Sequence, residues 1–90
     1  MLKLEIISPE KTLFSGEVTM ATIPGEEGEF GVQENHQPII AQLKAGEVQV
    51  FEGSDITKPT KSFKIEGGFA ETDGKKCIVL SDAIEAEEVA

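Results

Sequence analysis

The chain has no arginine and only eight lysines, against seventeen aspartates and glutamates. Its formal net charge at pH 7 is therefore −9. Affinity for nucleic acid or for an anionic lipid surface is built largely from Lys and Arg meeting phosphate, so neither is an expected partner. A basic protein partner suits this charge better, although the same charge also favours solubility without any partner.

Long apolar runs are also missing. No run approaches the roughly 20 residues that a membrane span needs, and residues 1–4 lack the basic start and apolar core of a secretion signal. We therefore expect a cytoplasmic location and no direct membrane insertion. The single cysteine, Cys77, permits no internal disulfide, and its place in an alternating run favours a small apolar role over a reactive one.

What the sequence does contain is alternation with a period of two. Leu2, Leu4 and Ile6 alternate with polar residues, and similar runs recur between turn signals such as Pro24-Gly25 and Gly53-Ser54-Asp55. Short strands at this spacing predict an all-β fold, an antiparallel β-sandwich of about eight to ten short strands. Residues 62–80 look like two strands joined at an Asp73-Gly74 hairpin, with a bulge at Gly67-Gly68.

The carboxy end departs from this pattern. Asp82 stands three residues before Glu85, as in a capping box, and Ala83 to Val89 are good helix formers. We expect a β-sandwich domain over residues 1–82 and a short helical tail over residues 83–90, marginal because of its length.

The segment IPGEEGEFGVQENHQPII, residues 23–40, is acidic and rich in turn residues. A phosphate loop is excluded because GEEGEFG carries three carboxylates and no lysine. Its glutamates and His36 are possible metal ligands, but a single imidazole without calcium-loop spacing makes a metal-binding domain the weakest alternative. We expect no catalytic residue, no cofactor, no metal and no small-molecule substrate, since the only histidine has no nucleophile in motif context.

A more specific functional alternative rests on the segment ETDGKK, residues 71–76. Lipoyl carrier domains are acidic β-sandwiches that resemble this chain, and they present a lysine at a hairpin tip to receive the swinging arm. Here that lysine would be Lys75, although Gly74 interrupts the motif and the position lies near the end of the chain. An ordinary Asp-Gly turn flanked by solvated lysines explains the same residues.

A larger set of features resembles the amino-terminal domain of the epsilon subunit of F-type ATP synthases, the counterpart of the mitochondrial delta subunit. The family pattern has a Ser-x-Glu and Phe-Ser-Gly start, a Gly-x-x-Gly-Glu-hydrophobic-Gly segment and a His-x-Pro turn before hydrophobic residues. In this sequence the features fall on Ser8, Glu10, Phe14, Ser15, Gly16, Gly25, Gly28, Glu29, Phe30, Gly31, His36, Pro38, Ile39 and Ile40.

The resemblance implies a non-catalytic rotor-stalk subunit that links the gamma subunit to the membrane c ring, without an active site of its own. It implies a peripheral position on the cytoplasmic side of the energy-transducing cell inner membrane. The implied partner-binding residues, toward the c ring or gamma, are Glu29, Phe30, Gly31, His36 and Pro38. We expect Phe30 and Val32 to point inward, and Glu29 and His36 to point outward at one end of the sandwich.

The sequence departs from the family pattern in two places. Glu34-Asn35 replaces the Pro-Gly that precedes the histidine, and asparagine tolerates the left-handed conformation that a glycine would adopt there. The carboxy-terminal helical hairpin of longer relatives, which restrains ATP hydrolysis, has no counterpart in these 90 residues. We therefore expect this chain not to restrain hydrolysis.

Overall fold

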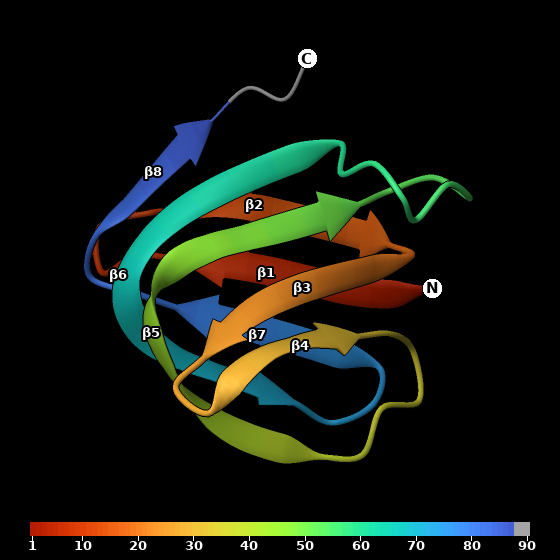
Figure 1. Ribbon diagram of the computed structural model, residues 1–90, viewed down its shortest axis with the longest axis horizontal. Coiled ribbons are helices and arrows are strands. Elements are labelled where there is room, and N and C mark those ends of the chain that lie inside the picture. Colours follow the sequence, from red (N-terminus) through yellow and green to blue (C-terminus); the bar gives the residue numbers. More distant parts are fainter. Residues whose placement is uncertain (88–90) are drawn as a thin grey trace.

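The computed structural model describes residues 1–87, and all of their regular structure is β-strand (Figure 1). The strands are β1 (Leu2–Ile7), β2 (Thr12–Val18), β3 (Met20–Gly25), β4 (Gly28–Val32), β5 (Ile39–Phe51), β6 (Lys61–Thr72), β7 (Lys76–Leu80) and β8 (Ile84–Glu87). The predicted all-β fold is confirmed. Within these residues no helix has the length and apolar character of a membrane span.

The strands form one continuous sheet in the order β2-β1-β7-β6-β5-β3-β4, and β8 pairs with β6 off this path. The two longest strands, β5 and β6, curve so that the sheet folds over on itself (Figure 1). The first half of β6 pairs with β8, whereas its second half pairs with β7. Two layers result, β8-β6-β5-β3-β4 and β5-β6-β7-β1-β2, and together they form a sandwich.

The bend in β6 depends on two glycines. The β5–β6 ladder passes from the pair Leu43–Gly68 to the pair Ala45–Glu66, and the intervening residues, Lys44 and Gly67, are not paired. Gly67 and Gly68 have φ angles of 125° and 135°, which side-chain-bearing residues rarely adopt. A Cβ atom on Gly68 would also overlap the carbonyl oxygen of Leu80. The register of the ladder is the same on both sides of Gly67, so the bulge predicted at Gly67-Gly68 is wrong. The two glycines instead mark the point where the strand bends from one layer to the other.

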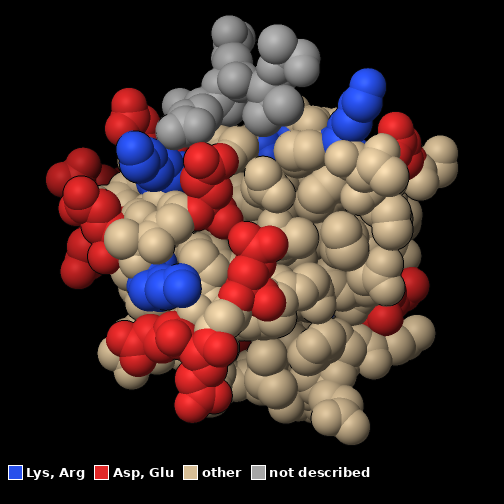
Figure 2. Space-filling view, viewed as in Figure 1, with Lys and Arg blue, Asp and Glu red and all other residues tan. Residues whose placement is uncertain are grey.

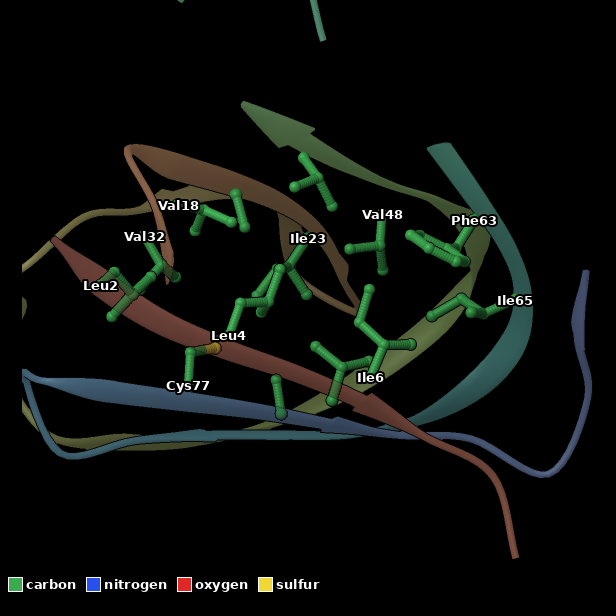
Figure 3. Packing of buried hydrophobic residues seen from close by; sticks show 14 of the residues in the cluster. Leu2, Leu4, Ile6, Val18, Ile23, Val32, Val48, Phe63, Ile65 and Cys77 are labelled. Carbon is green, nitrogen blue, oxygen red and sulfur yellow. The ribbon is translucent and has the colours of Figure 1, made fainter. Parts of the chain in front are cut away.

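The core lies between the two layers, and Figure 3 shows side chains from both layers pointing toward one another. Alternate residues of β1 (Leu2, Leu4 and Ile6) are fully buried, as their spacing predicts. Burying each such aliphatic side chain stabilises the fold by roughly 1.5–3 kcal/mol. The other core residues are Val18, Ala21, Ile23, Val32, Leu43, Val48, Val50, Phe63, Ile65, Ala70, Cys77 and Val79.

The predicted helix over residues 83–90 is wrong for residues 84–87. These residues form β8, whose ladder with β6 runs from the pair Ile65–Ile84 to the pair Ser62–Glu87. The capping signal at Asp82 and Glu85 is local and weak, whereas the first half of β6 offers a free edge whose backbone groups need partners. Residues 88–90 of the predicted tail lie outside the described residues.

Candidate partner-binding site

β4 carries three of the predicted site residues, Glu29, Phe30 and Gly31. It is the last strand in the sheet order and pairs only with β3, from Gly25–Gly28 to Ala21–Val32. An edge strand presents unpaired backbone groups as well as side chains to any neighbour. The position of these residues therefore suits contact with another molecule.

The side chains of β4 alternate as predicted. Val32 is fully buried and Phe30 packs against the core, whereas Glu29 is exposed. The Phe30 ring lies over Gly25, where a Cβ atom would come within 2.9 Å of a ring carbon and 2.8 Å of the Gly28 carbonyl oxygen. Gly25 is thus required by close packing, and Phe30 acts mainly as an anchor that fixes the turn to the core.

The loop after β4 holds the other two site residues, His36 and Pro38. Asn35 has a φ of 70°, the only positive value at a non-glycine residue within residues 1–87, which confirms the left-handed turn expected at this position. The backbone N–H of His36 donates to the carbonyl of Gln33 at 3.2 Å, and its half-buried ring places Nδ1 2.8 Å from the carbonyl oxygen of Gln37. His36 therefore shapes the turn through local backbone contacts.

This loop is held against neighbouring segments. The N–H of Asn35 donates to the carbonyl of Gly74 at 2.5 Å, and a Cβ atom on Gly74 would lie 3.0 Å from the carbonyl oxygen of His36. The amino group of Met1 forms an ion pair with Glu34 at 3.0 Å. The loop, the β6–β7 turn and the amino terminus therefore form one end of the sandwich.

The structure separates Glu29 from His36, so the expectation that both lie at one end is wrong. Glu29 is the second residue of β4, next to the β3–β4 turn, whereas His36 lies in the loop that leaves the opposite end of this strand (Figure 1). Of the seven steps between them, the three from Glu29 to Val32 run along β4, where an extended strand rises about 3.3 Å per residue, and the other four lie in the loop beyond it.

The β3–β4 turn is the acidic part of the site. Glu26, Glu27 and Glu29 are all exposed, and Figure 2 shows carboxylates gathered over this region of the visible face. None of the three takes part in an ion pair within residues 1–87, where the pairs join Met1 to Glu34, Lys61 to Glu52 and Lys76 to Glu5. This acidic turn can therefore attract a basic surface at short range.

The hairpin with Lys75 is an ordinary, well-ordered turn. Asp73 Oδ1 accepts hydrogen bonds from the N–H groups of Lys75 and Lys76, each at 2.9 Å, and these bonds lower the pKa of the Asp73 carboxyl. Gly74 has a φ of 99°, which confirms the hairpin predicted from Asp73-Gly74. Lys75 is exposed, but the turn packs against the 33–38 loop.

The structure also places the thiol and the possible metal ligands named in the sequence analysis. Cys77 is a buried free thiol in the core, and burial raises its pKa to about 11. Glu26, Glu27, Glu29, Glu34 and His36 do not converge: no group of three or more His, Cys, Asp or Glu residues in the described part of the chain is placed to hold a metal ion.

Sequence reasoning missed a second surface. Ile40, Phe69 and Leu80 are 75%, 54% and 46% exposed, although each lies in a strand whose neighbouring residues face the core. The available signal was the run Ile78-Val79-Leu80 together with Gly68-Phe69-Ala70, in which apolar residues occupy both faces of a strand. A sheet with one solvated face would place polar residues at the outer positions.

Comparison with known proteins identifies the family. Residues 1–87 match the family described as ATP synthase, Delta/Epsilon chain, beta-sandwich domain. An ATP synthase epsilon chain of Chlorobium limicola is 44% identical over 82 residues, which cover 91% of this chain and 90% of that relative. An ATP synthase epsilon chain of Caulobacter vibrioides is 43% identical over 86 residues, which cover 94% of this chain and 95% of that relative.

Other relatives are longer. The match to the ATP synthase epsilon chain of Leptospira interrogans, 40% identical over 81 residues, spans 61% of that protein. Chains in two solved structures share the fold. The Euglena gracilis mitochondrial ATP synthase, OSCP/F1/c-ring, gives a TM-score of 0.82 at 23% identity, covering 94% of this chain and 52% of that chain. The Tetrahymena thermophila mitochondrial ATP synthase, central stalk/c-ring, gives a TM-score of 0.77 at 14% identity, covering 93% of this chain and 65% of that chain.

These matches agree with the family resemblance described in the sequence analysis, and they favour it over a lipoyl carrier domain. They extend over the whole sandwich, from β1 to β8. The chain therefore belongs to the ATP synthase delta/epsilon chain family, and residues 1–87 are its β-sandwich domain.

Proposed function

We propose that this chain is a non-catalytic rotor-stalk subunit of a proton-translocating F-type ATP synthase. It links the gamma subunit to the c ring and so supports the coupling of proton flow to ATP synthesis. The observation that carries this proposal is the family match over all of residues 1–87, together with relatives of nearly the same length that are named ATP synthase epsilon chain.

The architecture suits a part that transmits torque. Two closely packed layers share a continuous core, and β5 and β6 run through both layers. Close-packed interiors resist deformation, so a force applied at one end of the sandwich is transmitted to the other. Such a part needs stiffness and complementary surfaces, and it does not need a pocket that excludes water.

The acidic β3–β4 turn is the proposed contact with the c ring. Glu29, with Glu26 and Glu27 beside it, supplies negative charge for a basic side chain on a polar loop of the ring. Phe30 and Gly31 fix the path of β4, while His36 and Pro38 shape the loop that leads into β5. Charges of this kind chiefly set orientation and association rate.

The proposed location follows from the same assembly. The chain sits on the cytoplasmic side of the cell inner membrane as a peripheral part of the complex, held by protein contacts. Neither a cofactor nor a small-molecule substrate takes part in this role. The Euglena gracilis and Tetrahymena thermophila assemblies, which contain a c-ring and a central stalk with c-ring respectively, support a place among the parts of such a complex.

Co-purification tests the proposal. Tagged chain is mixed with detergent-solubilised synthase stripped of this subunit, and with synthase that retains it as the matched control. We expect the tagged chain to elute with the stripped complex and not with the occupied one. Equal retention by both, or by neither, would contradict the proposal.

A further inference from the structure

The chain contains three sulfur atoms, in Met1, Met20 and Cys77. Cys77 is 1% exposed and lies in the core, whereas Met1 precedes β1 and is 56% exposed. Met20 is the first residue of β3, where it is paired with Phe51 of β5, and it is half-buried. Of the three, Met20 alone combines a fixed place in the sheet with access from solvent.

The sulfur of Met20 lies against the start of the 33–38 loop. Gln33, the first residue of this loop, donates a hydrogen bond from Nε2 to Met20 Sδ at 3.9 Å. A Cβ atom on Gly31 would lie 3.5 Å from the same sulfur, so the side chain of Met20 extends toward β4. Because a thioether sulfur is a weak acceptor, this contact holds Gln33 only loosely.

An open hollow of about 370 Å³ lies beside Met20. A water molecule occupies about 30 Å³ in the liquid, so the hollow admits a small peroxide and has room for one added oxygen atom. Met20 projects away from the core, since Ala21 beside it on the strand is fully buried. An oxygen on the sulfur therefore displaces no core side chain. The hollow is lined by Met20, Gly31, Gln33, Glu34, Asn35 and His36.

Hydrogen peroxide or an alkyl hydroperoxide can supply that oxygen. The O–O bond breaks, an S–O bond forms, the sulfur loses two electrons, and water or an alcohol leaves. The product, a sulfoxide, is polar, and its oxygen is a stronger acceptor than the thioether sulfur. The separation of 3.9 Å between Sδ and Gln33 Nε2 leaves room for this oxygen to accept from the amide at about 2.9 Å. Oxidation thus replaces a weak contact by an ordinary hydrogen bond.

We propose that Met20 is a reversible oxidation site, at which a peroxide forms a sulfoxide and Gln33 binds the sulfoxide oxygen, and that this bond tightens the 33–38 loop. The carbonyl of Gln33 accepts from the N–H of His36 at 3.2 Å, so a firmer hold on Gln33 extends to His36. Methionine sulfoxide reductases reverse the step: a pair of thiols is oxidised to a disulfide and the oxygen leaves as water. The inference goes beyond the proposed function and does not depend on it.

Peptide mapping by mass spectrometry tests the oxidation itself. The folded, unmodified chain is treated with hydrogen peroxide, and oxygen uptake at Met20 is timed against free methionine in the same solution. Met20 should react within roughly tenfold of the rate of free methionine, because its sulfur is reached without unfolding. Two reductases, one for each sulfoxide epimer, should then remove the added oxygen. Reaction that proceeds only as the chain unfolds would overturn the inference.

Amide hydrogen exchange tests the tightening of the loop. Oxidation should slow exchange of the N–H groups of Asn35 and His36 roughly threefold to tenfold, the effect of about one added hydrogen bond. Met20→Leu keeps the apolar volume and removes the sulfur, so peroxide should leave both exchange rates unchanged in this variant. Gln33→Ala keeps the sulfur and removes the donor, so Met20 should be oxidised there without any slowing.

The variants separate the possible causes, because Met1 is present and open to oxidation in all of them. Slower exchange in peroxide-treated Met20→Leu would assign the effect to Met1. Slower exchange in oxidised Gln33→Ala, or faster exchange in the oxidised unmodified chain, would show that Gln33 does not hold the sulfoxide. Each of these results would overturn the inference. Circular dichroism before and after oxidation checks the fold, and the proposed function is tested separately by binding to the stripped synthase.

Discussion

At the scale of single residues, backbone conformation decides which positions of this chain are constrained. Gly67, Gly68 and Gly74 adopt positive φ angles that only glycine adopts without strain, and Asn35 adopts one that asparagine tolerates. These positions were identifiable from the sequence because Gly-Gly, Asp-Gly and Asn before a turn are local signals. Their conformation depends little on the rest of the fold.

Gly68 is the position most sensitive to a small change. Gly68→Ala should lower the free energy of unfolding by about 2–4 kcal/mol, because the added methyl group meets the Leu80 carbonyl and the φ of 135° strains any other residue. Urea denaturation measures this loss. Gly53→Ala is the control, since no atom lies within 4 Å of its Cβ position, and it should change stability by less than about 0.5 kcal/mol. Equal effects of the two substitutions would contradict the role of the bend.

The thiol of Cys77 should be unreactive toward thiol reagents in the folded chain. Because burial raises the pKa of its thiol to about 11, the reactive thiolate is scarce at pH 8 and is also shielded from reagent. Reaction with a disulfide reagent such as DTNB should proceed only as the chain unfolds, and it should become rapid in 6 M guanidinium. Rapid reaction of the native chain would show that β7 opens readily or that Cys77 is exposed.

The position of Glu29 relative to His36 could not be read from residues alone. Both were expected at one tip because they are close in sequence, but the strand between them carries them apart. The exposure of Phe69 and Leu80 was missed for a related reason. Which face of a strand is covered depends on the path of distant strands, and no local pattern encodes that.

At the scale of elements, β8 shows tertiary pairing overriding a local signal. The capping pattern at Asp82 and Glu85 is typical of a helix start, yet residues 84–87 complete the edge of β6. Ser81 Oγ donates a hydrogen bond to the carbonyl of Gly67, and the N–H of Glu66 donates to the carbonyl of Ala83 at 3.2 Å. These contacts direct the chain along β6 before β8 begins.

Removing residues 84–90 tests how much this strand contributes. The truncated chain should stay folded but lose about 1–3 kcal/mol of stability, because it loses one short ladder and the partly buried side chain of Ile84. It should also aggregate faster, since the edge of β6 is then open. Urea denaturation and light scattering measure both effects. Complete unfolding would mean that β8 is part of the essential core.

The β3–β4 turn is the element whose charge should matter most for assembly. Glu29→Lys should weaken attachment to the stripped synthase roughly tenfold at low salt and much less at high salt, while leaving the isolated domain folded. Glu10→Lys is the matched control, because Glu10 is exposed in the loop between β1 and β2 and is in no ion pair within residues 1–87. If both variants attach equally well across the salt range, the turn is merely solvated.

At the scale of the whole molecule, period-two alternation and frequent turn signals were enough to predict a β-sandwich. They were not enough to predict that β5 and β6 belong to both layers, because the layers join through long-range pairing from Ile39–Thr72 to Val50–Lys61. The acidic segment over residues 23–40 was also evident from the sequence, but the separation of its carboxylates between the β3–β4 turn and the loop after β4 required the path of the chain.

The most direct test of the proposed role is proton-driven ATP synthesis in lipid vesicles. Synthase stripped of this subunit is reconstituted, an imposed proton gradient is applied, and ATP production is measured with and without added chain. We expect the chain to restore gradient-dependent synthesis. Unchanged synthesis despite saturating chain would contradict a coupling role for this domain.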